Sequence, residues 1–162
     1  AVSGAVHARF ERLLEALPQT EVQWMLSTQA AARIVARYEP SQGTPEEPAF
    51  TLAVGVYPEY IEYALLQNGA WYYSHYVDAE DPVDAAYFAT ALLDRLDIPR
   101  AAVTRIALYG IGADATAFAP FETVFDVAPE PVEPFGVLGL DRNVMHSDFG
   151  AGAYVPCVGA VL

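Results

Sequence analysis

The sequence predicts an α/β domain with a mixed sheet, in which an antiparallel three-strand meander is followed by parallel strands. Three strand-like segments, Phe50–Tyr57, Tyr60–Leu66 and Trp71–Val77, follow one another with only a few residues between them, as antiparallel hairpins do. A helix-like segment then precedes an apolar strand at Val103–Tyr109, and a helix is the usual connection between parallel strands. We therefore expect helices on both faces of the sheet.

The connections within this unit carry start and stop signals. Asn68-Gly69 lies between two apolar runs, and both residues tolerate the positive φ angles of a tight hairpin turn. Asp81 is suited to cap the following helix, and Pro82 suits its first position. The order of three strands, a helix and a fourth strand predicts the ribonuclease-H-like core that nucleases, actin-like ATPases and sugar kinases share.

The segments before this core are predicted to form a lead-in. The apolar spacing predicts helices over Val6–Leu17 and residues 27–38, with Glu21–Leu26 as a candidate strand between them. Residues 39–48 contain three prolines and three glutamates, which indicates a polar connection. The expected organisation is a helical and strand lead-in at 1–38, the connection at 39–48 and the ribonuclease-H-like core at 49–162.

The segments after the fourth strand are less regular. A short helix is expected over Asp114–Pro120, and the apolar segment Thr123–Val127 is expected to be the last strand. Residues 129–134 are rich in proline and glutamate and should be extended and exposed. A final helix is expected from about Tyr154, with Pro156 in its first turn because a proline inside a helix costs about 3 kcal/mol.

The composition excludes several classes of partner. The 162 residues carry a net charge of −13 and include no lysine, and such an acidic surface repels nucleic-acid phosphates. No apolar run approaches the roughly 18 residues that a membrane span needs, so we expect no membrane insertion. The single cysteine, Cys157, fits a reducing compartment, and we expect a cytoplasmic protein. Since the sequence begins at Ala1 without a methionine, we expect a processed product or part of a longer chain.

Candidate metal ligands and catalytic groups are sparse. His75 and His146 have no second histidine or cysteine at a metal-ligand spacing. Asp94 and Asp97 are neighbours on one helix, where a solvated face explains them better than an acid–base pair. A ribonuclease-H-like nuclease needs three or four carboxylates on the sheet, and the strand centres offer almost none beyond Glu62. We therefore expect no metal site, no catalytic residue and no enzymatic activity.

Three features together resemble a known family. They are the strand–turn–strand at Phe50–Leu66, the turn Leu108-Tyr109-Gly110-Ile111-Gly112-Ala113 and the ending at residues 154–162. Over roughly residues 5–162 they resemble the C-terminal half of the PilM-like family, the actin-like proteins of type IV pilus and type II secretion assembly. The resemblance implies that Gly110, Gly112 and Ala113 belong to a turn that approaches the adenosine of bound ATP.

The same resemblance implies that hydrolysis has been lost. In that family an Asp-x-Gly-x-x-x-Thr motif ends the first strand, and its aspartate orders magnesium and the attacking water. Here Ala53 takes the aspartate position, Gly55 matches the glycine, and no serine or threonine follows. The implied nucleotide site is a degenerate one at Gly55, Gly110, Gly112 and Ala113, with ATP as the only cofactor left open. The glycines at 110 and 112 have a second explanation, because any turn between a strand and a helix can require glycine for its backbone angles.

Aromatic residues crowd the meander and predict a protein-binding surface. Strict alternation puts Tyr72 and Tyr76 on one face of the sheet and Trp71 and Tyr73 on the other. Aromatics on both faces indicate either a fully covered sheet or a partner surface, since tyrosine and tryptophan are enriched in binding hot spots. The candidate partner surface comprises Tyr60, Trp71, Tyr72, Tyr73 and Tyr76.

These expectations combine into one leading hypothesis. The chain is expected to be a non-catalytic actin-like adaptor that binds a protein partner in pilus or secretion machinery. The alternative is a nucleotide-binding, actin-like ATPase half whose phosphate site another segment completes. A ribonuclease-H-like nuclease and an unrelated α/β domain with an aromatic binding face are further alternatives. The oligomeric state is left open.

Overall fold

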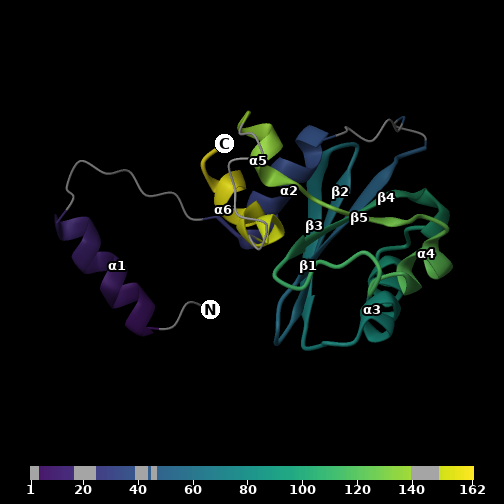
Figure 1. Ribbon diagram of the computed structural model, residues 1–162, viewed down its shortest axis with the longest axis horizontal. Helices are drawn as coiled ribbons and strands as arrows, with labels where there is room; N and C mark the ends of the chain where they lie inside the picture. The colour runs from purple at the N-terminus through teal and green to yellow at the C-terminus, as the bar shows by residue number, and fades with distance from the viewer. Residues whose placement is uncertain (1–3, 17–24, 39–43, 45–46, 140–149) are drawn as a thin grey trace.

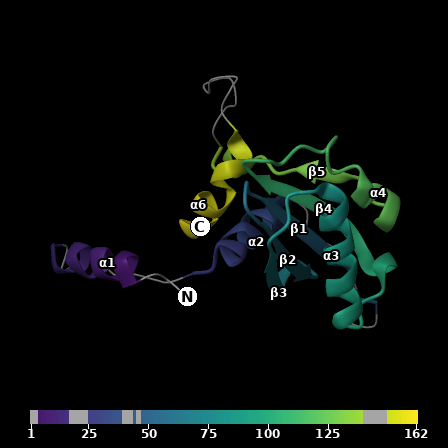
Figure 2. The same cartoon turned by 90° about the horizontal axis from the view of Figure 1, so that it is seen from below.

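The chain forms a sheet that lies between two layers of helices (Figures 1 and 2). The computed structural model describes residues 4–16, 25–38, 44, 47–139 and 150–162. The five strands have the order β3-β2-β1-β4-β5, so the most central strand is the first in sequence. The predicted mixed sheet with helices on both faces is confirmed.

The strands alternate in direction only within the predicted meander. β1 (Phe50–Val56), β2 (Ile61–Gln67) and β3 (Ala70–Val77) pair in antiparallel fashion, whereas β4 (Val103–Gly110) runs parallel to β1 and β5 (Pro129–Pro131) runs parallel to β4. Every residue of β1 is buried, which is why its sequence is apolar on both faces rather than alternating.

One face of the sheet is covered by α3 (Pro82–Arg95) and α4 (Pro120–Phe125). The cap predicted for α3 is present, because Oδ1 of Asp81 accepts a hydrogen bond of 2.7 Å from the backbone N–H of Val83. Tyr63 of β2 reaches this layer and donates to the carbonyl of Ala85 at 2.9 Å. We call this side of the sheet the α3 face.

The opposite face is covered by α2 (Ser27–Tyr38), α5 (Pro134–Val137), the 3₁₀ helix η3 (Ala151–Tyr154) and α6 (Val155–Ala160), and we call it the α2 face. Pro156 lies in the first turn of α6, as the sequence predicts. A methyl group at Gly159 would collide with the backbone carbonyl of Ala30, so the two helix backbones touch where α6 crosses α2.

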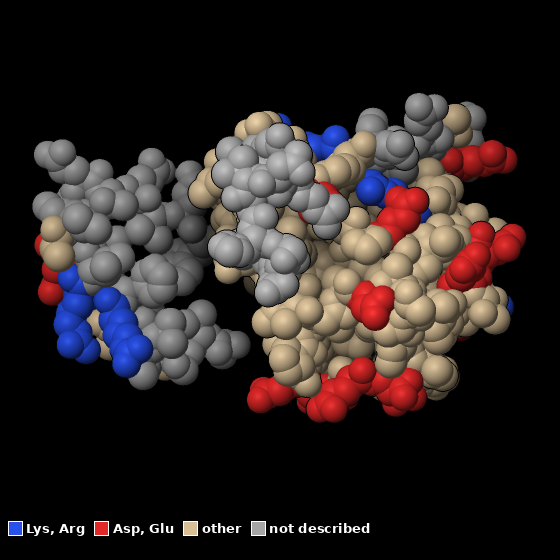
Figure 3. All heavy atoms as spheres, viewed as in Figure 1, with Lys and Arg blue, Asp and Glu red and all other residues tan. Residues whose placement is uncertain are grey.

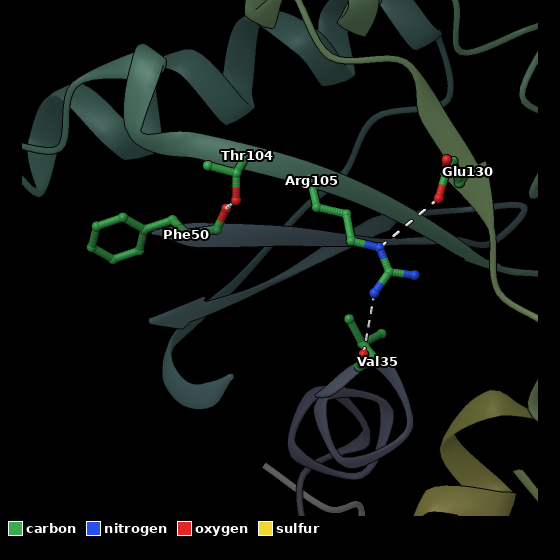
Figure 4. Close-up of polar contacts among 5 residues, drawn as sticks. All are labelled: Val35, Phe50, Thr104, Arg105 and Glu130. Carbon is green, nitrogen blue, oxygen red and sulfur yellow. Dashed lines mark hydrogen bonds and ion pairs between the residues drawn. The ribbon is translucent and has the colours of Figure 1, made fainter. Parts of the chain in front are cut away.

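An arginine on β4 ties the sheet to α2. Arg105 donates from Nη1 to the carbonyl of Val35 at 3.3 Å, and its Nε lies 4.0 Å from Oε2 of Glu130 on β5 (Figure 4). The adjacent Thr104 donates to the carbonyl of Phe50 at 3.4 Å. All these contacts lie away from the carboxyl ends of β1 and β4, so this cation has a structural role.

The N-terminal expectations are met only where the structure describes them. The helix predicted over Val6–Leu17 is present as α1, and its described residues are Gly4–Ala16. In both views α1 lies to the side of the sheet (Figures 1 and 2). The candidate strand at Glu21–Leu26 falls mostly outside the described residues, and Met25 and Leu26 are in no strand. The predicted division of the chain at residues 39–48 stays a prediction. Helix α2, which precedes this segment, shares a core with the sheet that follows it.

The predicted last strand at Thr123–Val127 is wrong. Helix α4 occupies Pro120–Phe125, and the last strand is β5, Pro129–Pro131. Phe121 and Phe125 lie four residues apart and are both buried, which is helical spacing, and Asp126 ends the helix with a left-handed φ of 56°. Residues 115–119 are turns rather than the helix expected over Asp114–Pro120.

The proline-rich segment after α4 is extended but only partly exposed. Pro129–Pro131 pairs with β4, and Pro129 and Val132 are buried. Proline is tolerated there because β5 is an edge strand with one side free of ladder hydrogen bonds.

Candidate functional site

The candidate site lies where the parallel strands β1 and β4 end. Val56 and Gly110 are paired at the ends of these strands, and the backbone N–H of Gly112 donates to the carbonyl of Val56 at 3.1 Å. In open α/β sheets, ligands bind beyond the carboxyl ends of the strands. The structure thus brings the predicted turn residues Gly110, Gly112 and Ala113 next to the end of β1.

Close packing against Val56, on its backbone and on its side chain, accounts for both glycines of this turn. Gly110 has a φ of +96°, and a methyl group there would lie 2.8 Å from the backbone nitrogen of Val56. A methyl group at Gly112 would lie 2.7 Å from Cγ1 of Val56. Gly152 of η3 sits against the same turn, since a methyl group on it would lie 3.1 Å from the carbonyl oxygen of Gly110. The turn is therefore packed on two sides by the chain itself.

Gly55, the fourth predicted residue, lies beneath two of the chain's own side chains. A methyl group at Gly55 would lie 2.6 Å from Cγ of Glu62 and 2.7 Å from the ring of Tyr109. Both side chains lie on the α2 face, Glu62 on β2 and Tyr109 on β4, and both are buried. Glycine is required here because the two side chains meet over β1.

Glu62 is a buried carboxylate held by hydroxyl groups. It is 4% exposed and accepts hydrogen bonds from Tyr109 Oη at 2.8 Å, Ser27 Oγ at 2.7 Å and Tyr57 Oη at 3.4 Å. These donors come from β4, the first residue of α2 and the turn after β1. Among the described residues no cation forms an ion pair with Glu62. The hydroxyls thus replace a counter-ion and join the sheet to α2.

Burial and the charge of Glu62 hold the two tyrosines in their protonated form. Burial, followed by the nearby carboxylate, raises the pKa of Tyr109 and of Tyr57 well above the ordinary value. Both hydroxyls therefore stay available as donors through the neutral range. Three hydroxyl groups therefore converge on the Glu62 carboxylate.

An acidic hollow opens beside Glu62. Its volume is about 510 Å³, and it is lined by Glu59, Tyr60, Glu62, Tyr76 and Asp78. The ring of Tyr60 stacks on that of Tyr57 at a centroid distance of 4.8 Å. Three carboxylates line this one hollow, so its electrostatic potential is negative.

Two further hollows flank β3. One, of about 570 Å³, lies between α2 and the start of β3, and its polar lining includes Arg33 and Arg37 beside Trp71. The other, of about 140 Å³, lies on the α3 face between Tyr73 and Phe88. The hollow beside Trp71 is basic, whereas the one beside Tyr76 is acidic.

A bulge in β3 overturns the predicted distribution of its aromatic residues. Tyr73 is paired with Leu65 and Trp71 with Leu66, so Tyr72 is an extra residue in the ladder. The bulge breaks the alternation, and Trp71 and Tyr73 lie on opposite faces although the sequence predicts the same one.

The pair predicted on the other face is separated as well. The ring of Tyr72 lies against Phe50 of the α3-face core, with 5.8 Å between centroids, whereas Tyr76 lies beside Glu62 on the α2 face. The predicted partner surface is thus divided, with Tyr60, Trp71 and Tyr76 on the α2 side and Tyr72 and Tyr73 on the α3 side.

Sequence reasoning noted Glu62 but missed its partners. A lone carboxylate in an apolar strand is a signal for a buried polar group that needs donors. Ser27 and Tyr109 lie 35 and 47 residues away in sequence, and only the tertiary fold brings them to Glu62.

The described residues contain neither a metal-binding cluster nor a membrane-spanning helix. Among the described residues, no group of three histidine, cysteine, aspartate or glutamate side chains is placed to hold a metal ion. In the same part of the chain, no helix combines the length and the apolar character that crossing a bilayer requires.

Comparison of the fold with solved structures finds similar architectures. A Bacteroides thetaiotaomicron protein with an actin-like ATPase fold and unknown function matches 75% of this chain and 45% of its own, with a TM-score of 0.54 and 10% identity. The PilM-PilN type IV pilus biogenesis complex matches 85% of this chain and 51% of the matched chain, with a TM-score of 0.56 and 15% identity. The chain has an actin-like fold.

The likeness is confined to structure. No family model matches the sequence, and no curated protein matches it. The chain spans about half of the length of the two actin-like structures. The ribonuclease-H-like, actin-like fold predicted from the sequence is thereby confirmed.

Proposed function

We propose that this chain belongs to an actin-like protein that no longer splits nucleotides and acts as an adaptor for a protein partner. One observation carries the proposal. The place where the resemblance puts the phosphate motif, at Ala53 and Gly55, has no aspartate and is filled by Glu62 and Tyr109. A buried carboxylate at that place opposes a phosphate group instead of binding it through magnesium.

The charge of the whole chain supports the same view. Acidic side chains are spread over the visible face of the sheet region (Figure 3), and the net charge is −13. The one described cation that reaches the centre of the sheet, Arg105, is engaged by Val35 and Glu130. A triphosphate would therefore meet a repulsive potential with few compensating donors.

The partner is proposed to be a protein of a pilus or secretion assembly on the cytoplasmic side. The similarity to the PilM-PilN complex motivates this choice, because that structure is itself a complex of pilus biogenesis. The proposed contact is the part of the aromatic surface on the α2 side, Tyr60, Trp71 and Tyr76. Exposed rings of this kind contribute disproportionately to protein binding.

The test of lost chemistry is titration calorimetry with magnesium-ATP, together with a phosphate-release assay. We expect neither binding nor turnover at millimolar nucleotide. Because the chain spans half of the similar structures, the same assay is run on the longest polypeptide that contains it. Micromolar binding with turnover would overturn the proposal and support the alternative of a nucleotide-binding half.

The test of the adaptor role is capture of partners from an extract of the source organism. The wild-type chain is compared with Trp71→Ala/Tyr76→Ala, and with Tyr87→Ala as a matched exposed-tyrosine control on α3. We expect a pilus or secretion component to be retained by the wild type and the control and lost with the double variant. Equal retention by all three would exclude the aromatic surface as the contact.

A further inference from the structure

The outer edge of β3 is a strand edge whose only protecting feature among the described residues is the bulge at Tyr72. β3 ends the sheet on one side (Figure 2), and the one described residue outside β2 that pairs with its backbone is Ala79, which donates to the carbonyl of Val77. Its eight residues, Ala70–Val77, include no proline and no charged side chain. Proteins usually protect long edge strands with such residues, because an open row of N–H and C=O groups pairs readily with another strand.

Large aromatic side chains mark the same strand. Trp71 is 40% exposed and Tyr76 is 68% exposed, and both lie on the α2 face. Such rings supply contact area at a low entropic cost when a second surface covers them. The backbone edge and the exposed rings therefore point to an added strand as the occupant.

Opposite charges lie at the two ends of this edge. Arg33 and Arg37 line the hollow beside Trp71, and Glu59 and Asp78 line the hollow beside Tyr76. The two rings are roughly 15 Å apart along the strand, so the charge centres are distinct at physiological salt. Both ends lie on the α2 face, which gives the edge an electrostatic polarity.

We propose that β3 pairs in antiparallel fashion with β3 of a second copy of this chain. A twofold axis at the middle of the edge reverses the strand direction, so the basic end of each copy meets the acidic end of the other. Neighbouring strands lie about 4.8 Å apart, a distance that arginine side chains span readily. The inference goes beyond the proposed function: a second copy and the proposed partner use the same edge, so they bind it in competition.

A second copy fits this edge better than an unrelated strand does. The net charge of −13 makes most contacts between two copies repulsive. The β3 edge is an exception, because the antiparallel arrangement creates two basic–acidic contacts at once from the same four residues, Arg33, Arg37, Glu59 and Asp78. The result is one continuous ten-strand sheet, made from two sheets of five strands.

Sedimentation equilibrium of the purified chain tests the proposal. We expect a reversible dimer with a dissociation constant in roughly the micromolar range. Arg33→Glu/Arg37→Glu makes both ends acidic, and Glu59→Arg/Asp78→Arg makes both ends basic. Each variant alone should associate at least about tenfold more weakly than the wild type. An equimolar mixture should recover a mixed dimer, because both contacts are then attractive.

A second pair of variants tests the edge independently of the charge ends. Tyr76→Lys places a solvated charge on the edge and should weaken the dimer at least about tenfold. Tyr87→Lys is the control, since Tyr87 on α3 is equally exposed at 68%, and it should leave association unchanged. Far-ultraviolet circular dichroism and the urea midpoint confirm that each variant is folded.

Several results would overturn the inference. A chain that stays monomeric at about 200 µM leaves the edge to a strand of another protein. A dimer that is insensitive to the charge reversals, or is weakened equally by Tyr87→Lys and Tyr76→Lys, uses another surface. Magnesium-ATP turnover would overturn the proposed function without affecting dimerisation. Loss of partner capture alone would likewise leave this inference standing.

Discussion

Glu62 is a buried negative charge that is stabilised by hydroxyl groups rather than by a cation. Its three donors come from separate elements, so the carboxylate fixes the position of α2 against the sheet. It also decides what the end of β1 can bind, because it lies over Gly55 with Tyr109. One side chain thus serves the packing of the α2 face and, with Tyr109, fills the space over Gly55.

A hydrogen bond to this charge should be worth more than a hydrogen bond to a neutral acceptor. Tyr109→Phe removes the 2.8 Å bond to Glu62 and should lower the free energy of unfolding by about 1.5 to 3 kcal/mol. Tyr63→Phe is the matched control, because it removes a 2.9 Å bond to the neutral carbonyl of Ala85 and should cost about 1 kcal/mol. Urea denaturation measures both. Equal losses of unfolding free energy in the two variants would mean that the hydrogen bond to Glu62 contributes no more than one to a neutral carbonyl.

The raised tyrosine pKa values predict a loss of stability in alkali. The pKa of Tyr109 and Tyr57 is raised in the folded chain, from the ordinary value of 10.0, by burial and then by Glu62. The unfolded chain therefore loses these protons first, so their contribution is intact below about pH 10 and declines as the pH rises further.

Urea titrations between about pH 8 and pH 11.5 measure this decline. Tyr57→Phe/Tyr109→Phe should flatten it relative to the wild type, because phenylalanine does not ionise. An unchanged slope in the double variant would show that other groups cause the alkaline loss.

At the scale of elements, the α2 face depends on a close crossing of two helices. Gly159 of α6 lies against the backbone of Ala30 in α2, so the interface has no room for a side chain. Val155 and Val158 of the same helix are buried as well. Helix α6 has only six residues, and isolated helices of that length are unstable in water. Its contact with α2 therefore holds it in place.

Gly159→Ala should therefore displace α6. The added methyl group collides with the Ala30 carbonyl, and we expect a loss of about 1 to 3 kcal/mol in the free energy of unfolding. Gly150→Ala is the control, because nothing lies within 4 Å of a methyl group there and its φ is −70°. Thermal unfolding and hydrogen exchange of residues 155–160 report the effect. Equal behaviour of the two variants would mean that α6 is not seated on α2.

The elements also show what the sequence alone can predict. The hairpin at Asn68-Gly69 and the cap at Asp81 are set by local backbone preferences, and both were predictable. The bulge at Tyr72 was not, because it depends on the register with β2, which no local pattern specifies. Part of helix α4 was predicted to be a strand. Apolar side chains four residues apart share one face in a helix and also in a strand, so a segment of six residues does not distinguish the two.

The same distinction explains the candidate site. The glycines of the turn after β4 were identified from their pattern, yet their role in packing against Val56 and Gly152 follows only from the fold. The network around Glu62 joins residues up to 47 positions apart, and its donors could not be assigned from sequence spacing. Pattern thus placed the candidate site at the carboxyl ends of β1 and β4, whereas the contacts around it follow only from the tertiary fold.

At the scale of the molecule, the actin-like sheet needs a helical layer on each face. Its central strands are apolar on both sides, so removing either layer exposes a hydrophobic surface. α2 supplies much of the second layer, through Ala31, Ile34 and Val35 against Ala53 and Leu66. Among the described side chains, burial begins at Thr28.

Two truncations should therefore behave differently. A chain that lacks residues 1–16 should keep its thermal midpoint within about 3 °C, because the core retains both helical layers. A chain that begins at residue 49 loses α2, uncovers Ala53, Ala64 and Leu66, and should aggregate or unfold without a cooperative transition. Differential scanning calorimetry of the two chains and the full chain measures this difference. A cooperative transition at the full-length midpoint for residues 49–162 would place the boundary of the folding unit at 39–48 and exclude α2 from the core.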